Sequence, residues 1–297
     1  MERSLQWEQM YLEYLGLREK PFSVTADPAF LYLSKRHREA LSHMVYGIRE
    51  RKGFMEITGE IGTGKTTLCK ALLRQLDGNT KTALMLQPGL SELQLLQTIM
   101  QDFGLDPMRS SRLQLFNVFN QFLLEQATLG NNTVLIIDEA QNLTPRVLEQ
   151  IRLLSNLETD KDKLIQIILV GQPQLREKLN LPSLRQLQQR IGVRYHIVPL
   201  DRDEVQTYID HRLRVAGSSG ELIWLEEAAE EVFRCSNGVP RLINLICDRT
   251  LLACYVLRVK QVDRHLVKRS YQELMGQTSD TQPQIASSEP AAPSPVS

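Results

Sequence analysis

A glycine-rich turn between two apolar segments leaves few folds open to this chain. The sequence FMEITGEIGTGKTTLCKALL, residues 54–73, predicts an apolar strand, a tight turn and a helix. Residues 59–66 within it match the pattern GxxxxGK[ST]. Glycines allow backbone N–H groups to turn inward, and the following helix presents its positive end, so a turn of this kind binds phosphate oxygens. We therefore expect the chain to hold a nucleoside triphosphate.

The positions of this phosphate loop have separate expected roles. Lys65 is expected to contact the β- and γ-phosphates, which makes it both a cofactor-binding and a catalytic candidate. The Thr66 hydroxyl is expected to be a ligand of Mg²⁺. The other expected nucleotide-binding positions lie beside these two residues: Gly59, Glu60, Ile61, Gly62, Thr63, Gly64 and Thr67.

A second functional segment, VLIIDEAQ, occupies residues 134–141. Its four apolar residues predict a buried strand, and Asp138 and Glu139 follow at the carboxyl end, the usual ligand edge of a parallel sheet. Asp138 is expected to hold Mg²⁺, and Glu139 to polarise the attacking water. By itself the segment could also be a strand that ends in solvated acids. Its position after a phosphate loop favours nucleotide hydrolysis.

Apolar runs alternate with helical patterns over the first 200 residues. The runs that favour strands lie at 54–58, 82–86, 133–138, 164–171 and 195–200. Near-continuous apolar strands separated by helices predict an α/β fold, in which helices cover both faces of a parallel sheet.

Two of the intervening helices can be placed from their first residues. One begins near Ser34, and another begins with Thr144 as its cap and Pro145 in its first turn. The second helix is expected to share one apolar face among Val147, Leu148, Ile151, Leu154 and Leu157.

A further helical pattern in residues 112–130 leaves two interpretations open. Four apolar side chains recur there at helical spacing: Leu113, Phe116, Phe119 and Leu123. The helix could pack on the sheet through them, or it could offer a groove to a partner.

The strands stop near residue 200, and the rest of the chain predicts a small all-helical lid. Its helices are expected at 202–215, 226–235, 240–257 and 262–275. We therefore expect a lead-in segment at 1–33, a P-loop core at 34–200, the lid at 201–277 and a tail at 278–297. The tail is rich in Pro, Ala and Ser and predicts disorder.

The charge balance limits the partners that the chain can attract at long range. Lys plus Arg and Asp plus Glu both total 35, so no bulk field draws the chain to nucleic acid or to an anionic membrane. No apolar run approaches the roughly 18 residues that span a bilayer, and the N-terminus lacks the apolar core of a signal peptide. We expect a cytoplasmic protein that reaches the inner membrane only through a partner.

Several stretches resemble the AAA+ ATPases, and among them the general secretion pathway protein A family, with a likeness to ATPases of exosortase and polysaccharide-export gene clusters. They include GFMEITGEIGTGKTTL, VLIIDEAQNLTPRVLEQIRLLSNLET, IILVGQPQL, LRQLQQRIGVRYHIVPLD and GVPRLINLICDR. With MYLEYLGLREKPFSVTADPAFLYLSKRHREAL, the resemblance extends from about residue 10 to about residue 270. It implies ATP and Mg²⁺ as cofactors, strand order 5-1-4-3-2, a helical lid, and assembly into rings or filaments.

The resemblance also implies roles for three residues outside the two motifs. Gln172 matches the first sensor near the γ-phosphate, although an ordinary loop glutamine is the alternative. Arg190 matches a finger that reaches the nucleotide of a neighbouring subunit, with Arg185 and Arg194 as competitors. Arg241 matches the second sensor, which couples the lid to the nucleotide.

The function implied by the resemblance is assembly or remodelling of an envelope-associated complex, such as a secretion, pilus or exopolysaccharide system. One alternative is an ATP-gated DNA-binding adaptor, similar to transposition regulators, in which a ring gathers Arg249, Arg264, Lys268 and Arg269 into one stripe. Another is a slow switch that binds ATP and a protein partner. Longer family members carry a membrane span and a peptidoglycan-binding domain after the ATPase. In this sequence the Pro/Ala/Ser tail follows the ATPase instead, so we do not extend direct cell-wall binding to it.

Overall fold

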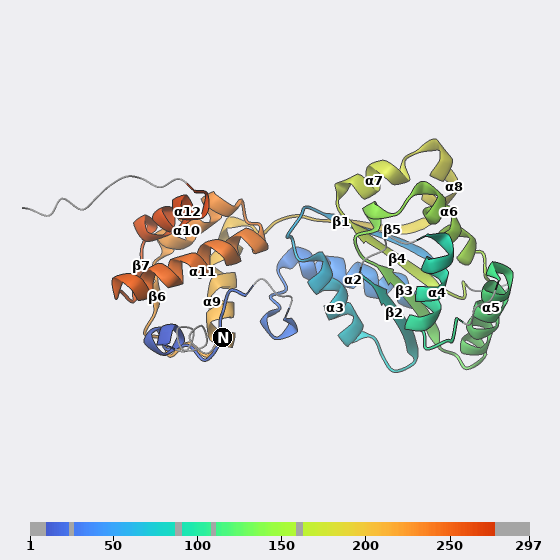
Figure 1. Cartoon of the computed structure of the whole chain (residues 1–297), viewed down its shortest axis with the longest axis horizontal. Coiled ribbons are helices and arrows are strands. Elements are labelled where there is room, and N and C mark those ends of the chain that lie inside the picture. Colours follow the sequence, from blue (N-terminus) through green and yellow to red (C-terminus); the bar gives the residue numbers. More distant parts are fainter. Residues whose placement is uncertain (1–9, 24–26, 87–90, 108–110, 159–162, 277–297) are drawn as a thin grey trace, which may run out of the picture.

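The computed structural model describes residues 10–23, 27–86, 91–107, 111–158 and 163–276. The tail expected to be disordered lies outside these ranges. Two lobes lie side by side along the longest axis of the molecule (Figure 1), one built on a sheet and one mainly helical. None of the helices in the described residues combines the length and the apolar character that a membrane span requires.

The first lobe contains a sheet of five parallel strands. They are β1 (Phe54–Gly59), β2 (Thr80–Met85), β3 (Asn132–Ile137), β4 (Gln166–Gly171) and β5 (Ile191–Ile197). Their spatial order is β2-β3-β4-β1-β5. The expected α/β fold and strand order are confirmed. Strand β5 begins earlier than expected because it is an edge strand, whose exposed positions carry polar residues such as Arg194 and interrupt the apolar run.

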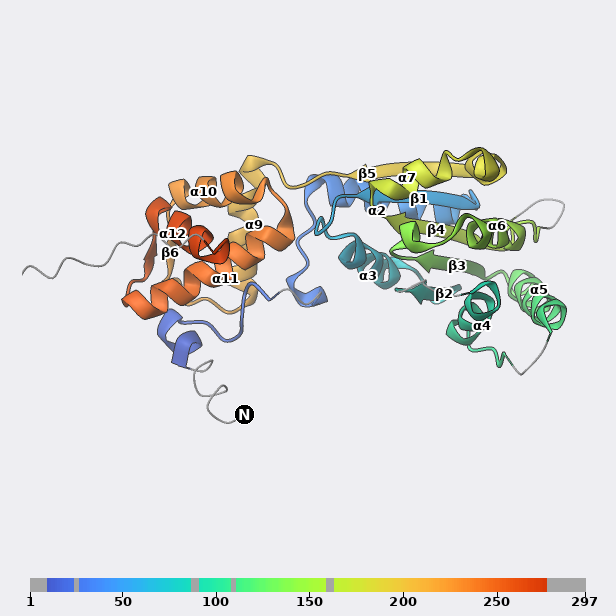
Figure 2. The ribbon, with the colours of Figure 1, turned by 45° about the horizontal axis from the view of Figure 1, so that its top comes forward.

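Helices cover both faces of the sheet (Figure 2). On one face lie α2 (Lys35–Arg49) and α3 (Lys65–Gln75), and on the other lie α4 (Glu92–Asp102), α5 (Arg112–Thr128) and α6 (Pro145–Leu154). Alternate residues of β3 enter the two cores, since Ile136 packs with α2 and α3 while Ile137 packs with α4 to α6. Strand β3, which is buried from Thr133 to its end, therefore ends at a fixed point on the carboxyl edge.

The first turns of α2 and α6 follow their sequence signals. The Ser34 hydroxyl caps α2 by accepting from the backbone N–H of His37 at 3.3 Å. Thr144 caps α6, and Pro145 is its first residue. Leu157, expected on the apolar face of this helix, lies beyond its last residue and packs against the same core from the following loop.

Helix α5 differs in part from its expected packing. Phe119 and Leu123 are fully buried against the sheet, together with Leu115. Leu113 is 70% exposed, and with Phe116 it lines a cavity of about 630 Å³ between α4, α5 and α6. The buried face follows the spacing Leu115, Phe119, Leu123, so the expectation that Leu113 packs on the sheet is wrong.

The second lobe contains four long helices: α9 (Arg202–Val215), α10 (Glu226–Ser236), α11 (Pro240–Leu257) and α12 (Arg264–Leu274). Two short strands, β6 (Ile223–Trp224) and β7 (Gln261–Val262), form a parallel ladder beside them. The expected helical lid is confirmed, and this short ladder is a feature that the sequence did not predict. Strands of two residues are too short to give a periodic sequence pattern. They pair the segment just before α10 with the segment just before α12.

The N-terminal segment shares the core of the lid. Tyr11, Leu15 and Phe22 are buried in one apolar cluster with residues of α9, α10 and α11. The backbone N–H of Arg18 donates to the carbonyl of Ala216 at 2.8 Å. The short helix η1 (Pro28–Phe30), which precedes α2, lies between the two lobes, where it contacts α3 and α9.

Candidate nucleotide-binding site

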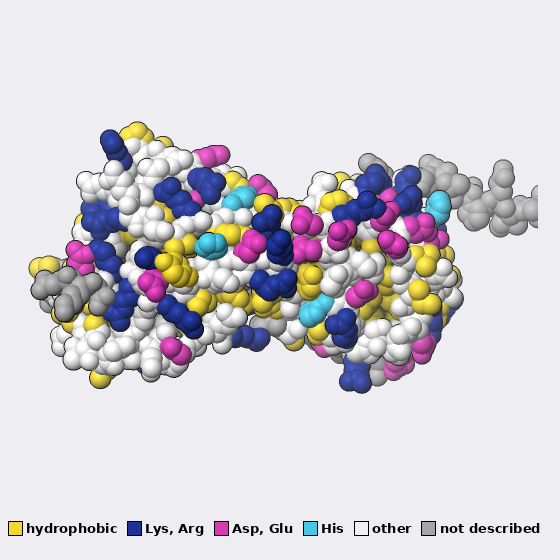
Figure 3. Space-filling view, turned by 180° about the vertical axis from the view of Figure 1, so that it is seen from behind, with side chains coloured by type: hydrophobic (Ala, Val, Ile, Leu, Met, Phe, Trp, Pro, Cys, Tyr) yellow, Lys and Arg dark blue, Asp and Glu magenta, His cyan; other side chains and the backbone are white. Residues whose placement is uncertain are grey.

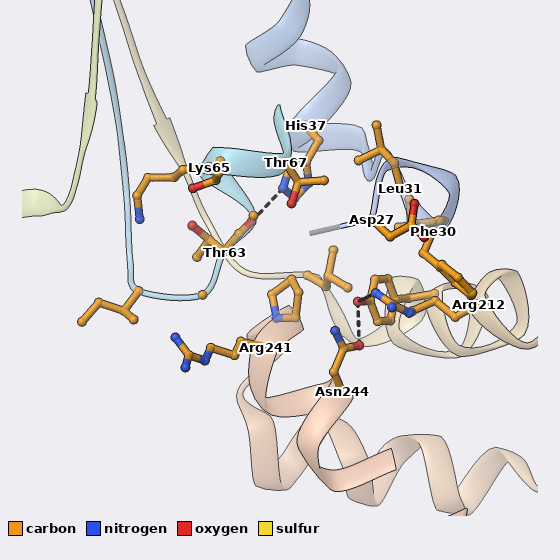
Figure 4. Close-up of a pocket in the computed structure, with 18 of the residues that line it drawn as sticks. Asp27, Phe30, Leu31, His37, Thr63, Lys65, Thr67, Arg212, Arg241 and Asn244 are labelled. Carbon is orange, nitrogen blue, oxygen red and sulfur yellow. Dashed lines mark hydrogen bonds between the residues drawn. The ribbon is translucent and has the colours of Figure 1, made fainter. Parts of the chain in front are cut away.

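A cavity of about 330 Å³ lies where the phosphate loop, the lid and the N-terminal segment meet (Figure 4). It is lined by residues from segments that are far apart in the sequence: the loop and first turn 61–67, Glu139, Gln172, the pair Pro240 and Arg241, and a group of side chains from η1, α2, α9 and α11. Most of the expected site residues therefore face one space.

The phosphate loop forms a tight turn that only glycines tolerate at two positions. Gly62 and Gly64 have φ angles of 80° and 93°, in the left-handed region. Gly64 precedes the first residue of α3, and no side chain caps this helix. The first N–H groups of α3 are therefore free to bind an anion, and the positive end of the helix favours it.

The Lys65 side chain folds back onto the phosphate loop. Its Nζ donates to the carbonyl oxygens of Gly59 and Glu60, both at 2.9 Å. The side chain is buried, and burial lowers the pKa of Lys65, while the nearby carboxylates of Glu139 and Asp138 act in the opposite direction. Its ammonium group lies in the loop and is held by neutral oxygens that a phosphate oxygen could replace.

Thr66 and Asp138 meet at the end of β3. The Thr66 hydroxyl donates to Asp138 Oδ2 at 2.5 Å, and Asp138 Oδ1 accepts from the backbone N–H of Glu139 at 2.8 Å. Burial raises the pKa of Asp138, and these two hydrogen bonds oppose the effect. A hydroxyl and one carboxylate fit Mg²⁺, which takes one or two protein ligands and completes its shell with water and phosphate oxygens.

Glu139 lies beside this pair in a left-handed backbone conformation, with φ at 53°. One carboxylate oxygen accepts from Gln141 Nε2 at 2.6 Å and from Gln172 Nε2 at 3.4 Å. The expected first-sensor position and the expected water-polarising residue are thus in contact. Gln141 was not among the expected site residues, although it lies two positions after Glu139 in the segment that contains both.

Gln141 is held firmly from several sides. Its side-chain Oε1 accepts from the backbone N–H of Gln172 at 3.0 Å. Its backbone carbonyl oxygen accepts from Nζ of Lys178 in α7 (Pro173–Leu179). A Cβ atom at Gly171 would lie 2.7 Å from Gln141 Oε1. Strand β4 must therefore end in a glycine for this amide to occupy its position.

Arg241 approaches the phosphate loop from the lid. Its backbone N–H donates to the carbonyl of Gly62 at 3.3 Å, and a Cβ atom at Gly62 would lie 2.7 Å from Arg241 Cβ. The guanidinium group lines the cavity and has no hydrogen-bond partner within the described part of the chain. It is therefore available to a negatively charged ligand.

The other end of the cavity is apolar and aromatic. Phe30, Leu31 and Tyr208 line it, and the Tyr208 hydroxyl donates to Asn244 Oδ1 at 2.8 Å. Arg212 donates to the Tyr208 hydroxyl at 3.0 Å and lies over the ring of Phe30 at 5.0 Å. This end suits a flat ring system with apolar faces and polar edges, such as a nucleobase. Sequence patterns did not identify it, because its side chains come from three separate segments.

Two comparisons with known sequences identify the type of protein. A model of the AAA domain family matches residues 48–179. General secretion pathway protein A of Aeromonas hydrophila is 47% identical over 247 residues, which cover 83% of this chain. The chain thus contains an AAA domain and is similar to general secretion pathway protein A over most of its length. It spans 45% of the length of that relative.

Several solved structures share the fold of this chain at low sequence identity. The Aeropyrum pernix ORC2 protein has a TM-score of 0.61 at 17% identity, over 82% of this chain and 68% of that one. A chain of the Drosophila ORC bound to DNA has a TM-score of 0.63 at 21% identity, over 90% and 66%. Thermotoga maritima RuvB has a TM-score of 0.54 at 18% identity, over 81% and 69%.

Among the expected site residues, Gly59, Glu60 and Asp138 adjoin the cavity without lining it, whereas Arg190 lies far from it. Its guanidinium group donates to Ser155 Oγ at 3.2 Å and to Asn156, on the far side of the sheet lobe. Its competitor Arg194 binds Glu56, whereas the Arg185 guanidinium has no partner among the described residues. All three lie away from their own chain's phosphate loop.

Proposed function

We propose that this protein is an AAA+ ATPase that binds ATP with Mg²⁺ between its two lobes and uses hydrolysis to assemble or remodel an envelope-associated complex. The observation that supports the hydrolytic role most directly is the 2.5 Å contact of Thr66 with Asp138, with Glu139 next in the chain. The likeness to a general secretion pathway protein supports the envelope assignment. Secretion, pilus and exopolysaccharide systems are the classes of client that we propose.

Each residue of the site has a part in this proposal. The backbone N–H groups of 62–67 bind the phosphate oxygens, and Lys65 exchanges its two carbonyl partners for the β- and γ-phosphates. Thr66 and Asp138 hold Mg²⁺, which neutralises the charge that develops on the phosphates. Glu139 orients and polarises the attacking water. The remaining loop residues, Gly59, Glu60 and Ile61, shape the turn.

The lid and the sensor residues complete the proposed site. Gln172 holds the Glu139 carboxylate and contacts the γ-phosphate or the attacking water. Arg241 contacts the phosphates from the start of α11, so the position of the lid follows the nucleotide state. The nucleobase occupies the apolar end between Phe30 and Tyr208.

We further propose that the active form is a self-associated ring or filament. Arg190, Arg185 and Arg194 lie away from their own chain's cavity, as an arginine that acts on a neighbouring subunit must. An arginine supplied in this way raises hydrolysis by roughly 10³ to 10⁵ in other nucleotide hydrolases. We place this assembly in the cytoplasm, at the inner membrane through its partner.

The alternative of a DNA-binding adaptor is less well supported. Arg249 and Arg269 both bind Glu273, and Arg264 binds Glu230, so three of the cations expected in a basic stripe are paired with carboxylates. Basic and acidic side chains are interspersed on the face of the molecule seen in Figure 3. DNA binding through phosphates needs a continuous basic surface, and acidic side chains interrupt the basic ones on this face.

The test is the steady-state rate of ATP hydrolysis per subunit over a range of protein concentrations, with and without duplex DNA. The proposal expects a rate that rises with concentration and is unaffected by DNA. A rate that DNA switches on would favour the adaptor instead. No hydrolysis at any concentration, with ATP still bound, would favour the slow switch.

A further inference from the structure

A buried histidine contacts the phosphate loop and is one of the residues that line the cavity. His37 lies in the first turn of α2 and is 5% exposed. Its Nε2 lies 2.8 Å from the carbonyl oxygen of Thr63 (Figure 4). Its Nδ1 lies 2.7 Å from the Ser34 hydroxyl. A Cβ atom at Gly64 would lie 3.0 Å from His37 Nε2, so the ring is packed directly against the loop.

The partners of His37 determine which ring nitrogen carries the proton. A carbonyl oxygen can only accept a hydrogen bond, so Nε2 is the donor to Thr63. The Ser34 oxygen already accepts from the backbone N–H of His37, and its hydroxyl hydrogen is free to donate to Nδ1. The neutral imidazole therefore satisfies both of its nitrogens. Burial lowers the pKa of His37, which favours the same neutral form.

This hydrogen bond fixes the orientation of one peptide group of the loop. The peptide that joins Thr63 to Gly64 is planar and trans, so its carbonyl and its N–H point in opposite directions. His37 holds the carbonyl on the side of α2. The N–H of Gly64 then points away from His37, and Gly64 is one of the loop residues that line the cavity.

We propose that His37 is a positioning residue for nucleotide binding, which aims the Gly64 N–H at the phosphates by holding the Thr63 carbonyl. The ring does not contact the nucleotide in this proposal and takes no part in the chemical step. The proposal rests on the proposed function, because it requires phosphate in the loop. Loss of the donor must therefore weaken nucleotide binding much more than it slows hydrolysis at saturating ATP.

The first turn of α2 also contacts the lid. The backbone N–H of Lys35 donates to Glu204 Oε1 at 2.9 Å, and the other oxygen of Glu204 accepts from the backbone N–H of Asp201 at the start of α9. This contact holds α2 against the lid independently of His37. A substitution that removes only the His37 donor should therefore leave the position of α2 unchanged.

The test compares His37→Phe, which keeps a flat ring without a donor, with His37→Gln, whose amide can still donate to the Thr63 carbonyl. The control is His43→Gln in the same helix, where an exposed histidine packs on Tyr195 at 5.2 Å. The measurements are the Kd of Mg-ATP by titration with a fluorescent ATP analogue and competition, the KM and kcat of ATP hydrolysis, and the melting temperature.

We expect His37→Phe to raise Kd and KM about tenfold or more, because it leaves a buried carbonyl unpaired and the Gly64 N–H misdirected, while kcat stays within about threefold. His37→Gln should remain within about threefold of the unaltered protein, as should the control. If His37→Phe does not fold, His37→Asn replaces it. The shorter side-chain amide of Asn cannot reach the Thr63 carbonyl, so this variant must show the same loss of Mg-ATP binding.

Two results would overturn the inference. One is a donor-free variant that folds and binds Mg-ATP as tightly as the unaltered protein. The other is a Gln variant as weak as the Phe variant, which would mean that only ring packing matters. Failure of the unaltered protein to bind Mg-ATP would overturn the proposed function itself, so the two failures are distinguishable.

Discussion

The side-chain amide of Gln141 donates to the carboxylate of Glu139 at 2.6 Å. The oxygen of the same amide accepts from the backbone N–H of Gln172, at the end of the neighbouring strand β4. One side chain thus connects the proposed water-polarising residue to the proposed first sensor. The orientation of Glu139 is therefore set by residues that follow two neighbouring strands, β3 and β4, as well as by its own backbone.

Gln141→Ala should slow hydrolysis without weakening nucleotide binding. Removal of the amide leaves the Glu139 carboxylate with the longer contact to Gln172 alone, so the base is less well oriented toward the water. We expect kcat to fall about tenfold with KM nearly unchanged. Steady-state kinetics measure both values. The control is Gln121→Ala, a similar truncation on the exposed side of α5, and an unchanged kcat in Gln141→Ala would remove the orienting role.

Gly171→Ala tests the same network from the backbone side. The added Cβ would lie 2.7 Å from Gln141 Oε1, so the amide must move and its contact with Glu139 must weaken. We expect a loss of kcat similar to that of Gln141→Ala, with the fold retained. Gly78→Ala is the matched control, because no atom lies within 4 Å of its added Cβ. Equal kcat in the two glycine variants would contradict the prediction.

The architecture could be predicted from the sequence because its signals are local. The apolar strand before the phosphate loop, the acidic end of β3 and the cap Thr144 each depend on residues that are adjacent in the chain. The contacts of Gln141 with Gln172 and of His37 with Thr63 could not be predicted, because these partners lie on other elements and only the folded chain brings them together. Sequence identified Glu139 but gave no indication of what orients it.

The lid was less predictable for a related reason. The N-terminal residues Tyr11 and Leu15 pack in the lid core with residues that lie near the other end of the sequence. No local sequence pattern indicates such a contact. The ladder of β6 and β7 has two residues in each strand, which is too short for an alternating pattern. In α5, the spacing of Leu113 and Phe116 resembled a buried face, but Leu115 occupies the buried position instead.

Lys65→Ala and Glu139→Gln should separate binding from hydrolysis. Without Lys65 the phosphates lose their charged partner in the loop, and we expect no measurable Mg-ATP binding. Glu139→Gln keeps the shape of the side chain but removes the base, so we expect Kd within about threefold and kcat reduced by about 10² or more. Competition titration and single-turnover hydrolysis measure the two effects. Full activity of Glu139→Gln would exclude the water-polarising role.

Arg190→Ala tests whether subunits complete each other's sites. If Arg190 acts on the nucleotide of a neighbour, its loss should abolish most hydrolysis while leaving Mg-ATP binding in the same chain intact. Mixing with Glu139→Gln subunits should then restore part of the activity, because an Arg190→Ala subunit supplies an intact Glu139 and its neighbour supplies an intact Arg190.

The mixing experiment also separates Arg190 from its competitors. Arg185→Ala is the matched control on the same edge of the sheet, in the short helix α8 (Arg185–Gln188). Rescue of Arg190→Ala with an active Arg185→Ala would assign the role to Arg190. The role would move to Arg185 if Arg190→Ala stays active while Arg185→Ala is inactive and is rescued by Glu139→Gln subunits. The hydrogen bonds of Arg190 to Ser155 and Asn156 would then be only structural.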